Sequence, residues 1–289
     1  MNPQLIYDVG MNNGDDTAYY LSRGFRVLAI EPNPQLVATA AARFRHEIQA
    51  GDLTILNIGV AAEDGELPFW VCETDSRLSS FDLRDIAINS SYTAREIRVQ
   101  TRAFRSILDD FGTPFYLKID IQGNDRLCVE ALTPSQLPRF LSIEFRLSDT
   151  RLLALMHARG FKQFKCISQS HFLPLELPLL PQARMVQRAQ RLNQSMNPLA
   201  RIVRKLGGRR WIAHHVDRLR VQNDWVFPPG SSGPFGDETL GRWLSYDEIR
   251  TTTQHFLRVR AQAPHTLLWA PRGLGTNPFW TDLHARADV

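Results

Sequence analysis

The chain has 289 residues, 43% of them hydrophobic, and a formal net charge of +4, so it can bury a full core as an ordinary globular protein. Its three cysteines, Cys72, Cys128 and Cys166, are widely separated, which argues against a disulfide framework and against a zinc site. The most apolar stretch, residues 172–180, is short and interrupted by prolines, so we expect no membrane span. A β-prone run begins at Leu5 and leaves no room before it for a secretion signal, so we expect a cytoplasmic protein.

The first predicted element is a strand followed by a turn rich in glycine. Residues 5–9 are a short β-prone run and a helical pattern begins at Ala18, so the chain must turn between them. Gly10 and Gly14 suit this turn, because glycine reaches backbone angles closed to other residues and leaves room for a ligand beside the main chain. We interpret residues 10–14, the glycine loop, as a cofactor cradle.

A second β-prone run, residues 25–30, leads directly to Glu31. This acid lies about 20 residues beyond the glycine loop, where nucleotide-binding βαβ units place a carboxylate on the ribose hydroxyls. The loop and the acid together predict a ligand that carries adenosine.

The charge of the loop indicates which ligand this is. A dinucleotide site uses three glycines, but Asn12 occupies the middle position, which disfavours an NAD-dependent oxidoreductase. Asp8, Asp15 and Asp16 surround the turn with negative charge, which would repel a pyrophosphate but suits a ligand with an amino group and a sulfonium. That ligand is S-adenosylmethionine. The alternative is a turn that only links a strand to a helix.

The next elements continue an alternation of strands and helices. Residues 34–44 are rich in alanine and predict a helix that covers the sheet, with Asn33 as its cap. Residues 53–61 predict a third, buried parallel strand. Asn57 would then lie near the adenine, although Asn57 and Gly59 would equally suit a role in strand packing alone.

An elaboration follows the third strand. Residues 67–72 predict one arm of a small antiparallel ribbon, and residues 97–101 are also strand-like. Between them, residues 73–94 are polar and rich in serine, which predicts a loop of the kind that commonly carries function. Residues 104–111 predict a short helix that ends at Gly112.

Residues 115–121 predict a fourth buried strand with two charged positions. Because an unpaired buried charge is costly, Lys118 and Asp120 should lie near the open end of this strand, at the carboxyl edge where open α/β sheets bind ligands. In the alternative, Lys118 forms a salt link to a neighbouring acid and Asp120 caps the next helix.

Two further strands with their helices complete the predicted sheet as far as residue 167. Residues 125–132 predict a helix, and residues 140–145 predict a fifth strand whose last acid, Glu144, reaches the same edge as Asp120. Residues 152–159 predict another helix and residues 161–167 a sixth strand.

Three motifs lie in order along this part of the chain. They are Asp-Val-Gly-Met-Asn-Asn-Gly-Asp-Asp-Thr at residues 8–17, Glu-Pro-Asn at residues 31–33 and Leu-Lys-Ile-Asp-Ile-Gln-Gly at residues 117–123. Over residues 5–170 the chain resembles the FkbM family of S-adenosylmethionine-dependent methyltransferases, whose patterns are D-x-G-x-N-x-G-x-x-T, E-P and L-K-I-D-V-E-G. The resemblance implies a class I methyltransferase with a Rossmann-like α/β fold, a seven-stranded, mostly parallel sheet, and methyl transfer to an oxygen.

The motifs and the predicted sheet edge indicate the site residues. Those expected to bind S-adenosylmethionine are Asp8, Gly10, Asn12, Gly14, Thr17, Glu31, Pro32, Asn57 and Asp120. Those expected on the acceptor side are Asp120, Gln122, Glu144 and His171. Gln122 departs from the family, which normally has glutamate at this position, so the local negative charge is one lower. We therefore expect a metal-independent site in which Asp120 orients or deprotonates a hydroxyl of a small metabolite, such as a sugar or a natural product.

A seventh strand is expected only at residues 279–285, so the roughly 110 residues before it should form a subdomain inserted ahead of the last strand. The predicted domains are a core that binds S-adenosylmethionine (1–170), a basic insertion rich in helix, glycine and proline (171–278) and a final strand that returns to the core (279–289). Within the insertion, residues 228–243 carry four glycines and three prolines. They predict a shaped lid or rim, with a plain linker as the alternative.

The insertion also concentrates the positive charge of the chain. Residues 182–222, the basic stretch, hold ten Arg or Lys against one acid, a net charge of +9 that leaves −5 for the rest. This stretch could contact anionic lipid or a phosphate-bearing partner, or it could be a solvated arginine face packed on the core. It lacks a nucleic-acid-binding signature, so nucleic acid is not expected. The alternative to an enzyme is a binding module whose cofactor site is vestigial. The sequence also leaves open whether the protein forms a homo-oligomer.

Overall fold

The computed structural model of the protein describes residues 2–86, 91–185, 202, 218–262 and 280–287. The chain forms two compact units. The first holds Met1–Glu144, Ala154–Phe161 and Ala285–Val289, and the second holds Phe145–Leu153 and Lys162–His284. The predicted division into a core, an insertion and a final strand remains a prediction. Over the described residues, no helix has the length and apolarity needed to cross a membrane.

Parallel strands form the main sheet of the first unit, in the hydrogen-bonded order β8-β7-β1-β2-β3. Their bounds are β1 (Asn2–Val9), β2 (Arg26–Ile30), β3 (Leu53–Leu56), β7 (Pro114–Ile119) and β8 (Phe140–Phe145). Val9 pairs with Ile30 on one side and with Ile119 on the other, so three strands end at one edge. The strand order reverses between β1 and β7, and ligands of open α/β sheets bind beyond the carboxyl ends at such a reversal.

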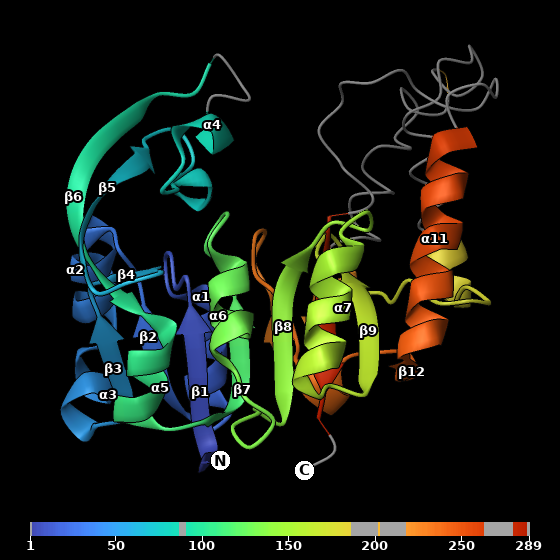
Figure 1. Ribbon diagram of the computed structural model, residues 1–289, viewed down its shortest axis with the longest axis horizontal. Helices are drawn as coiled ribbons and strands as arrows, with labels where there is room; N and C mark the ends of the chain where they lie inside the picture. Colours follow the sequence, from blue (N-terminus) through green and yellow to red (C-terminus); the bar gives the residue numbers. More distant parts are fainter. Residues whose placement is uncertain (1, 87–90, 186–201, 203–217, 263–279, 288–289) are drawn as a thin grey trace. The chain divides into compact units, whose positions relative to one another are not determined.

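Helices lie between the strands of this unit along the chain. Their bounds are α1 (Asp15–Ser22), α2 (Pro34–Arg43), α3 (Arg45–Ala50), α5 (Phe104–Phe111) and α6 (Asp125–Ala131), and α5 and α6 lie over the face of the sheet turned to the viewer in Figure 1. Asn33 caps α2 as predicted, because its side-chain oxygen accepts the backbone N–H of Gln35 at 3.0 Å. The predicted helix at residues 104–111 is also confirmed, and it ends at Gly112.

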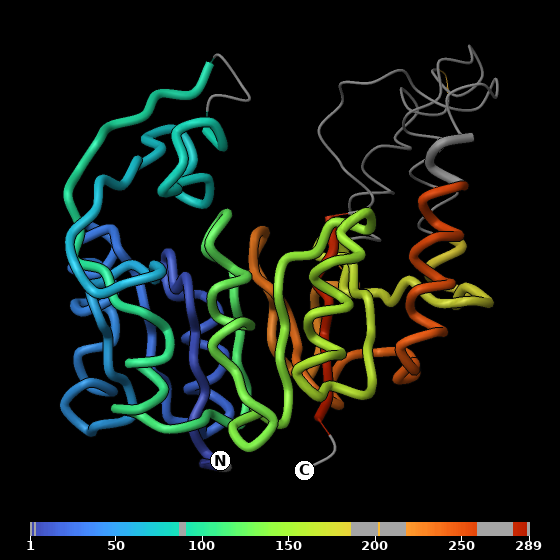
Figure 2. Tube along the Cα trace, in the orientation of Figure 1, coloured from blue at the N-terminus to red at the C-terminus, as the bar shows by residue number. Residues whose placement is uncertain are grey.

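A second, three-stranded sheet extends beyond the carboxyl ends of β1, β2 and β3 (Figures 1 and 2). It contains β4 (Gly59–Ala61), β5 (Gly65–Cys72) and β6 (Ala94–Ala103), and η1 (Ser76–Leu78) and α4 (Leu83–Ile86) lie between β5 and β6. Phe69, Val71 and Val99 form its apolar core, and Phe81 packs on Phe69 with ring centroids 5.0 Å apart. The predicted ribbon is thus confirmed.

The prediction of one continuous strand over residues 53–61 is wrong. The chain leaves the main sheet after Leu56, and Gly59 pairs instead with Thr101 of β6. The physical reason lies at the break: the side-chain amide of Asn57 donates to the backbone oxygens of Glu31 and Pro32, at 2.9 and 3.0 Å. Gly59 also packs so tightly on Phe81 that a Cβ atom would lie 2.3 Å from its ring.

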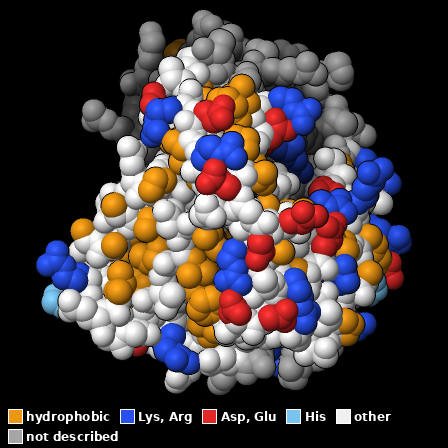
Figure 3. Space-filling model, turned by 60° about the vertical axis from the view of Figure 1, so that its left-hand side comes forward, with side chains coloured by type: hydrophobic (Ala, Val, Ile, Leu, Met, Phe, Trp, Pro, Cys, Tyr) orange, Lys and Arg blue, Asp and Glu red, His pale blue; other side chains and the backbone are white. Residues whose placement is uncertain are grey.

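Surface charges of the first unit are largely arranged as ion pairs. Figure 3, which turns the side of β5 and β6 forward, shows Lys and Arg side chains intermixed with Asp and Glu. Arg98 pairs with Glu66 across this sheet, and Arg102 lies 2.7 Å from Asp110. Exposed pairs of this kind add little stability, so the sheet depends on its apolar core.

The second unit contains the strand order β12-β9-β13, with β12 antiparallel to β9. Its elements are β9 (Gln163–Ser168), β10 (Val221–Gln222), β11 (Trp225–Val226), η3 (Gly236–Glu238), β12 (Leu244–Ser245), α11 (Tyr246–Gln262) and β13 (Thr281–Arg286). The last two residues of β13 belong to the first unit, and α7 (Thr150–Arg159) belongs partly to each unit. The protein is therefore an α/β protein with a large mixed sheet. Among the described residues this sheet has eight strands, so the predicted count of seven is not confirmed.

Residues 228–243 are packed into the second unit. Phe235 is 4% exposed, and the indole N–H of Trp243 donates to Asp237 at 2.8 Å. Beneath them, the buried ammonium group of Lys165 donates to the backbone and hydroxyl oxygens of Thr239 and lies 4.5 Å from the centre of the Trp243 ring. Such packing is unlike a plain linker, and the role of a lid remains a prediction.

Candidate functional site

The glycine loop is held close to its neighbours by its main chain. The backbone N–H groups of Gly10 and Met11 both donate to the oxygen of Ile30, at 3.0 Å. Gly10 has a φ of +88°, and a Cβ atom there would lie 1.9 Å from the backbone oxygen of Asp120. A Cβ atom on Gly14, where φ is +80°, would lie 2.7 Å from the ring of Phe44. Both positions therefore require glycine.

Asp8 supports this loop from inside the sheet. Its carboxylate is fully buried, lies 3.0 Å from the Nζ atom of Lys118, and accepts the hydroxyl of Thr17 at 2.6 Å. Lys118 also donates to the backbone oxygen of Gly10 at 2.6 Å. Asp8 and Thr17, predicted as cofactor contacts, thus hold the loop in place.

Lys118 lies one residue before the end of β7, near the end of the strand as predicted. It is 3% exposed, and its ion pair with Asp8 matches the alternative of a salt link. Burial alone would lower the pKa of Lys118, but the carboxylates of Asp8, Asp120 and Asp16 outweigh it and raise the pKa, so Lys118 stays charged.

Glu31 lies at the carboxyl end of β2, and its side chain is 6% exposed. One carboxylate oxygen accepts the backbone N–H of Asn12 and the other that of Asn33, each at 2.9 Å. Burial raises the pKa of Glu31 to about 7, although both hydrogen bonds oppose the shift. With Asn57 bound to the oxygens of Glu31 and Pro32, the fold brings four predicted cofactor residues together.

The serine-rich loop reaches the glycine loop. Ser76 of η1 donates its hydroxyl to the side-chain oxygen of Asn12 at 3.1 Å. Ser76 also lines a polar cleft of about 580 Å³, whose other lining residues are Asn33, Gln35, Leu36, Thr39, Val71, Cys72, Glu73, Thr74 and Arg95. The composition of residues 73–94 indicated a functional loop, but it did not identify Ser76.

The other side of the strand-order reversal carries Asp120, Gln122 and Glu144. The side-chain amide of Gln122 lies 3.3 Å from an oxygen of Asp120 and 3.0 Å from an oxygen of Glu144. All three side chains are half-buried. The fold therefore brings together three of the four predicted acceptor-side residues, within the first unit.

The loop after β7, residues 120–125, is closed by Asp125. Its carboxylate accepts the backbone N–H groups of Ile121 and Gly123, at 3.1 and 3.0 Å. The alternative in which Asp120 caps α6 is therefore not what the structure shows, and Asp120 is left facing Gln122.

His171, the fourth predicted acceptor-side residue, belongs to the second unit. It is 5% exposed, and its Nδ1 atom accepts the backbone N–H of Leu173 at 3.3 Å. Burial, with a further contribution from Arg220, lowers the pKa of His171 to about 4, so the imidazole is neutral at pH 7. Its catalytic role remains a prediction.

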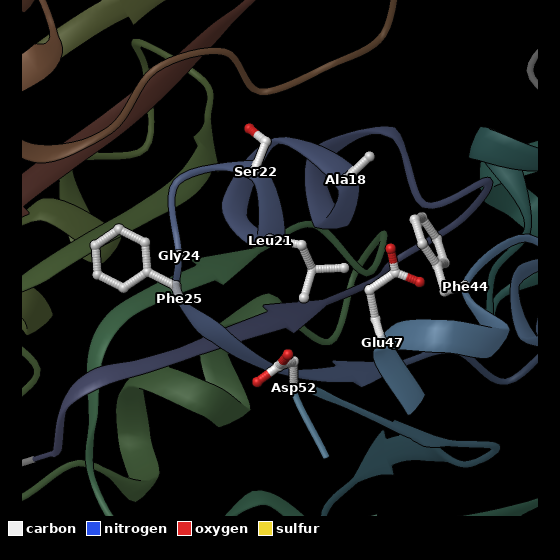
Figure 4. Close-up of a pocket in the computed structure, with 8 residues that line it drawn as sticks. All are labelled: Ala18, Leu21, Ser22, Gly24, Phe25, Phe44, Glu47 and Asp52. Carbon is white, nitrogen blue, oxygen red and sulfur yellow. The ribbon is translucent and has the colours of Figure 1, made fainter. Parts of the chain in front are cut away.

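A second pocket, of about 300 Å³, opens at the opposite edge of the main sheet (Figure 4). Phe25 immediately precedes β2 and Asp52 immediately precedes β3, so this pocket lies at the amino ends of the strands. Its remaining lining residues are Ala18, Leu21, Ser22, Gly24, Phe44 and Glu47. Because ligands of open α/β sheets bind at the carboxyl ends, this pocket is not the candidate site.

Known proteins offer several comparisons. A methyltransferase FkbM from Methylobacillus flagellatus KT is 20% identical with a TM-score of 0.38, covering 56% of this chain and 39% of that one. A precorrin-6y C5,15-methyltransferase from Geobacter metallireducens GS-15 is 14% identical with a TM-score of 0.32, covering 57% of this chain and 66% of that one. This chain thus spans less than two thirds of the length of either protein. At these TM-scores, nothing about this chain is inferred from the two structures. No curated protein gives a match.

The family match is more decisive. The model of the methyltransferase FkbM domain matches residues 8–162, from Asp8 near the end of β1 to the residue before β9. All three sequence motifs lie inside this range. Because the match covers more than half of the chain, the protein belongs to the FkbM methyltransferase family.

Proposed function

We propose that the protein transfers a methyl group from S-adenosylmethionine to a hydroxyl oxygen of a small metabolite. The observation that carries the proposal is the arrangement at the strand-order reversal, where Glu31 and Asn12 are joined at 2.9 Å beside a glycine loop with no space for a Cβ atom at Gly10. The close contact of Gly10 with Asp120 places the glycine loop directly beside the end of β7.

The residues at this edge fit the proposed cofactor. Each carboxylate oxygen of Glu31 accepts one backbone N–H and keeps a second lone pair for a ribose hydroxyl. Asp8 and Asp15 are paired with Lys118 and Arg43, and Asp120, directly after β7, is an acid that favours a positively charged ligand. S-adenosylmethionine supplies an electrophilic methyl group when bound.

The chain itself contributes alignment and a proton acceptor. Asp120 is half-buried at the end of β7 and takes up the proton of the acceptor hydroxyl, which makes the oxygen a better nucleophile. Holding the hydroxyl in line with the methyl group accounts for much of the remaining rate gain, because it replaces a bimolecular encounter.

The proposal is tested first by calorimetry of the full chain with S-adenosylmethionine, and then by assaying S-adenosylhomocysteine release with a panel of hydroxylated acceptors. We expect binding, and turnover with acceptors that carry free hydroxyls. Binding of NAD instead of S-adenosylmethionine would contradict the proposal.

The proposal extends to the location and partners of the protein. We propose a cytoplasmic location and, through the basic stretch, a contact with anionic lipid. Its net charge of +9 supports this contact, since each basic residue near an anionic surface contributes about 1 kcal/mol. Within it, Arg204, Lys205, Arg209 and Arg210 lie outside the described residues.

Reversing these four residues to Glu should abolish binding to vesicles that contain phosphatidylserine, and binding by the native chain should weaken steeply with salt. If the native chain does not bind such vesicles at low salt, the stretch is a solvated face. A polyanion without lipid, such as heparin, separates a membrane contact from general attraction to negative charge.

A further inference from the structure

Gln122 has a backbone conformation that residues with a side chain seldom adopt. Its φ is +47°, and the following Gly123 has a φ of +99°. The hydroxyl of the buried Ser80 donates to the backbone oxygen of Gln122 at 3.0 Å, and Asp125 closes the loop from the other side. Unfavourable backbone angles of this kind persist where the surroundings impose them, and they cluster at functional sites.

The side chain of Gln122 joins two acids that come from neighbouring strands. Its amide nitrogen is 3.3 Å from Asp120 and 3.0 Å from Glu144. Ionised carboxylates only accept hydrogen bonds, so the nitrogen of the amide, rather than its oxygen, must face both of them. Each amide hydrogen then has its own carboxylate.

Two carboxylates held this close normally attract a proton or a hard cation. In this site, the positive end of the amide dipole of Gln122 lies between them. Two cations interact with Asp120: Lys118, which is paired with Asp8, and Arg77, which is paired with Asp75. The carboxylate of Asp125 interacts with it as well. Within the described part of the chain, no group of three or more His, Cys, Asp or Glu side chains could hold a metal ion.

We propose that the side-chain amide of Gln122 occupies the place between Asp120 and Glu144 that a divalent cation would otherwise take, and so creates a cation-independent site for an uncharged, hydroxyl-rich acceptor. The inference rests on the proposed methyl transfer. Asp120 and Glu144 accept hydrogen bonds from acceptor hydroxyls, while an acceptor with a phosphate or carboxylate next to the reacting oxygen is repelled. Gln122 is a positioning residue in this site.

The test converts the amide into a third carboxylate. Gln122→Glu should bind Mn²⁺, measured by electron paramagnetic resonance without cofactor or acceptor, at least about tenfold more tightly than the native chain, because cation affinity follows the number of charged ligands. Gln100→Glu is the matched control, since Gln100 also donates to a carboxylate, that of Glu66 at 3.0 Å, but on the exposed surface of β6. It should not gain affinity for Mn²⁺.

Equal Mn²⁺ affinity of the native, Gln122→Glu and Gln100→Glu chains would overturn the inference. So would tight binding of Mn²⁺ by the native chain that is lost in Asp120→Asn. If Gln122→Glu does not fold in buffer alone, millimolar Ca²⁺ should restore its folding, and failure of this rescue would equally overturn the inference. These measurements need neither cofactor nor turnover. Their outcome is therefore independent of whether the protein transfers a methyl group.

Discussion

The glycine loop and the 120–125 loop lie on either side of the same strand-order reversal, yet they are built in opposite ways. In the glycine loop, the charged side chains of Asp8 and Glu31 are bound by the protein itself, and the backbone N–H groups of Gly10 and Met11 are bound to Ile30. In the 120–125 loop, Asp125 and Ser80 fix the main chain, and the side chains of Asp120 and Gln122 are presented.

We infer from this difference that the side chains of the glycine loop mainly support the structure, whereas those of the 120–125 loop are available for the reaction. A ligand that is the same in every reaction cycle can be held by one fixed arrangement of the loop and Glu31. An acceptor that differs between enzymes must be recognised by side chains, which do vary. Substitutions on the two sides should therefore fail differently, in stability and cofactor affinity on one side and in turnover on the other.

The largest expected effect is on stability, at the ion pair below the glycine loop. Lys118→Met leaves the carboxylate of Asp8 buried without its cation, which should cost about 3–5 kcal/mol of unfolding free energy, measured by urea denaturation. Removing both charges, in Asp8→Asn with Lys118→Met, should recover part of this loss. An unchanged transition in the single variant would show that the pair does not support the loop.

A somewhat smaller effect should follow pH, through Glu31. Its pKa rises from 4.5 to about 7 on folding, so the stability it contributes is fully present below pH 4.5 and is lost as pH rises through 7. Relative to Glu31→Gln, which cannot titrate, the ligand-free native chain should lose about 3 kcal/mol across this range. If the urea midpoints of the two proteins change with pH in the same way, the raised pKa of Glu31 is contradicted.

On the other side of the reversal, the expected loss is in rate. Asp120→Asn keeps an oxygen that can accept the amide of Gln122 but cannot take a proton. Turnover should fall by about 10²-fold or more, with little change in affinity for S-adenosylmethionine. A fully active variant would remove Asp120 from the mechanism, and a loss confined to cofactor affinity would erase the contrast between the two loops.

The smallest expected effect is on cofactor binding. Glu31→Ala removes the proposed acceptor of both ribose hydroxyls, and since charged hydrogen bonds contribute about 1.5–3 kcal/mol each, affinity should fall about tenfold or more by calorimetry. Glu47→Ala is the control, because Glu47 lines the pocket at the opposite sheet edge. Unchanged affinity in a folded Glu31→Ala chain would show that the ribose does not bind there.

The sequence predicted the parts of this site that depend on local patterns. The strand, glycine turn and helix around Gly10, the acid at Glu31 and the cap at Asn33 are each encoded within a few neighbouring residues. The break after Leu56 was missed because it depends on where Asn57 meets the backbone oxygens of another strand.

Contacts between distant residues were the hardest to predict. The bridge from Gln122 to Glu144 requires the register of β8 beside β7, and composition carries no information about that register. The same holds for the hydrogen bond from Ser76 to Asn12, which joins residues 64 positions apart. Sequence therefore indicated which residue types form the site, and the fold determined which of them touch.

The hydrogen bond from Lys118 to Gly10 spans 108 positions of the chain. During synthesis the amino-terminal strand, its turn and its helix leave the ribosome first, but β7, which pairs with β1 and carries Lys118, follows much later. Contacts of such long sequence separation form slowly, because a large loop must close first. Nascent chains that end before residue 118 should therefore be unable to bind the proposed cofactor, so any stabilisation by it is expected only late in synthesis.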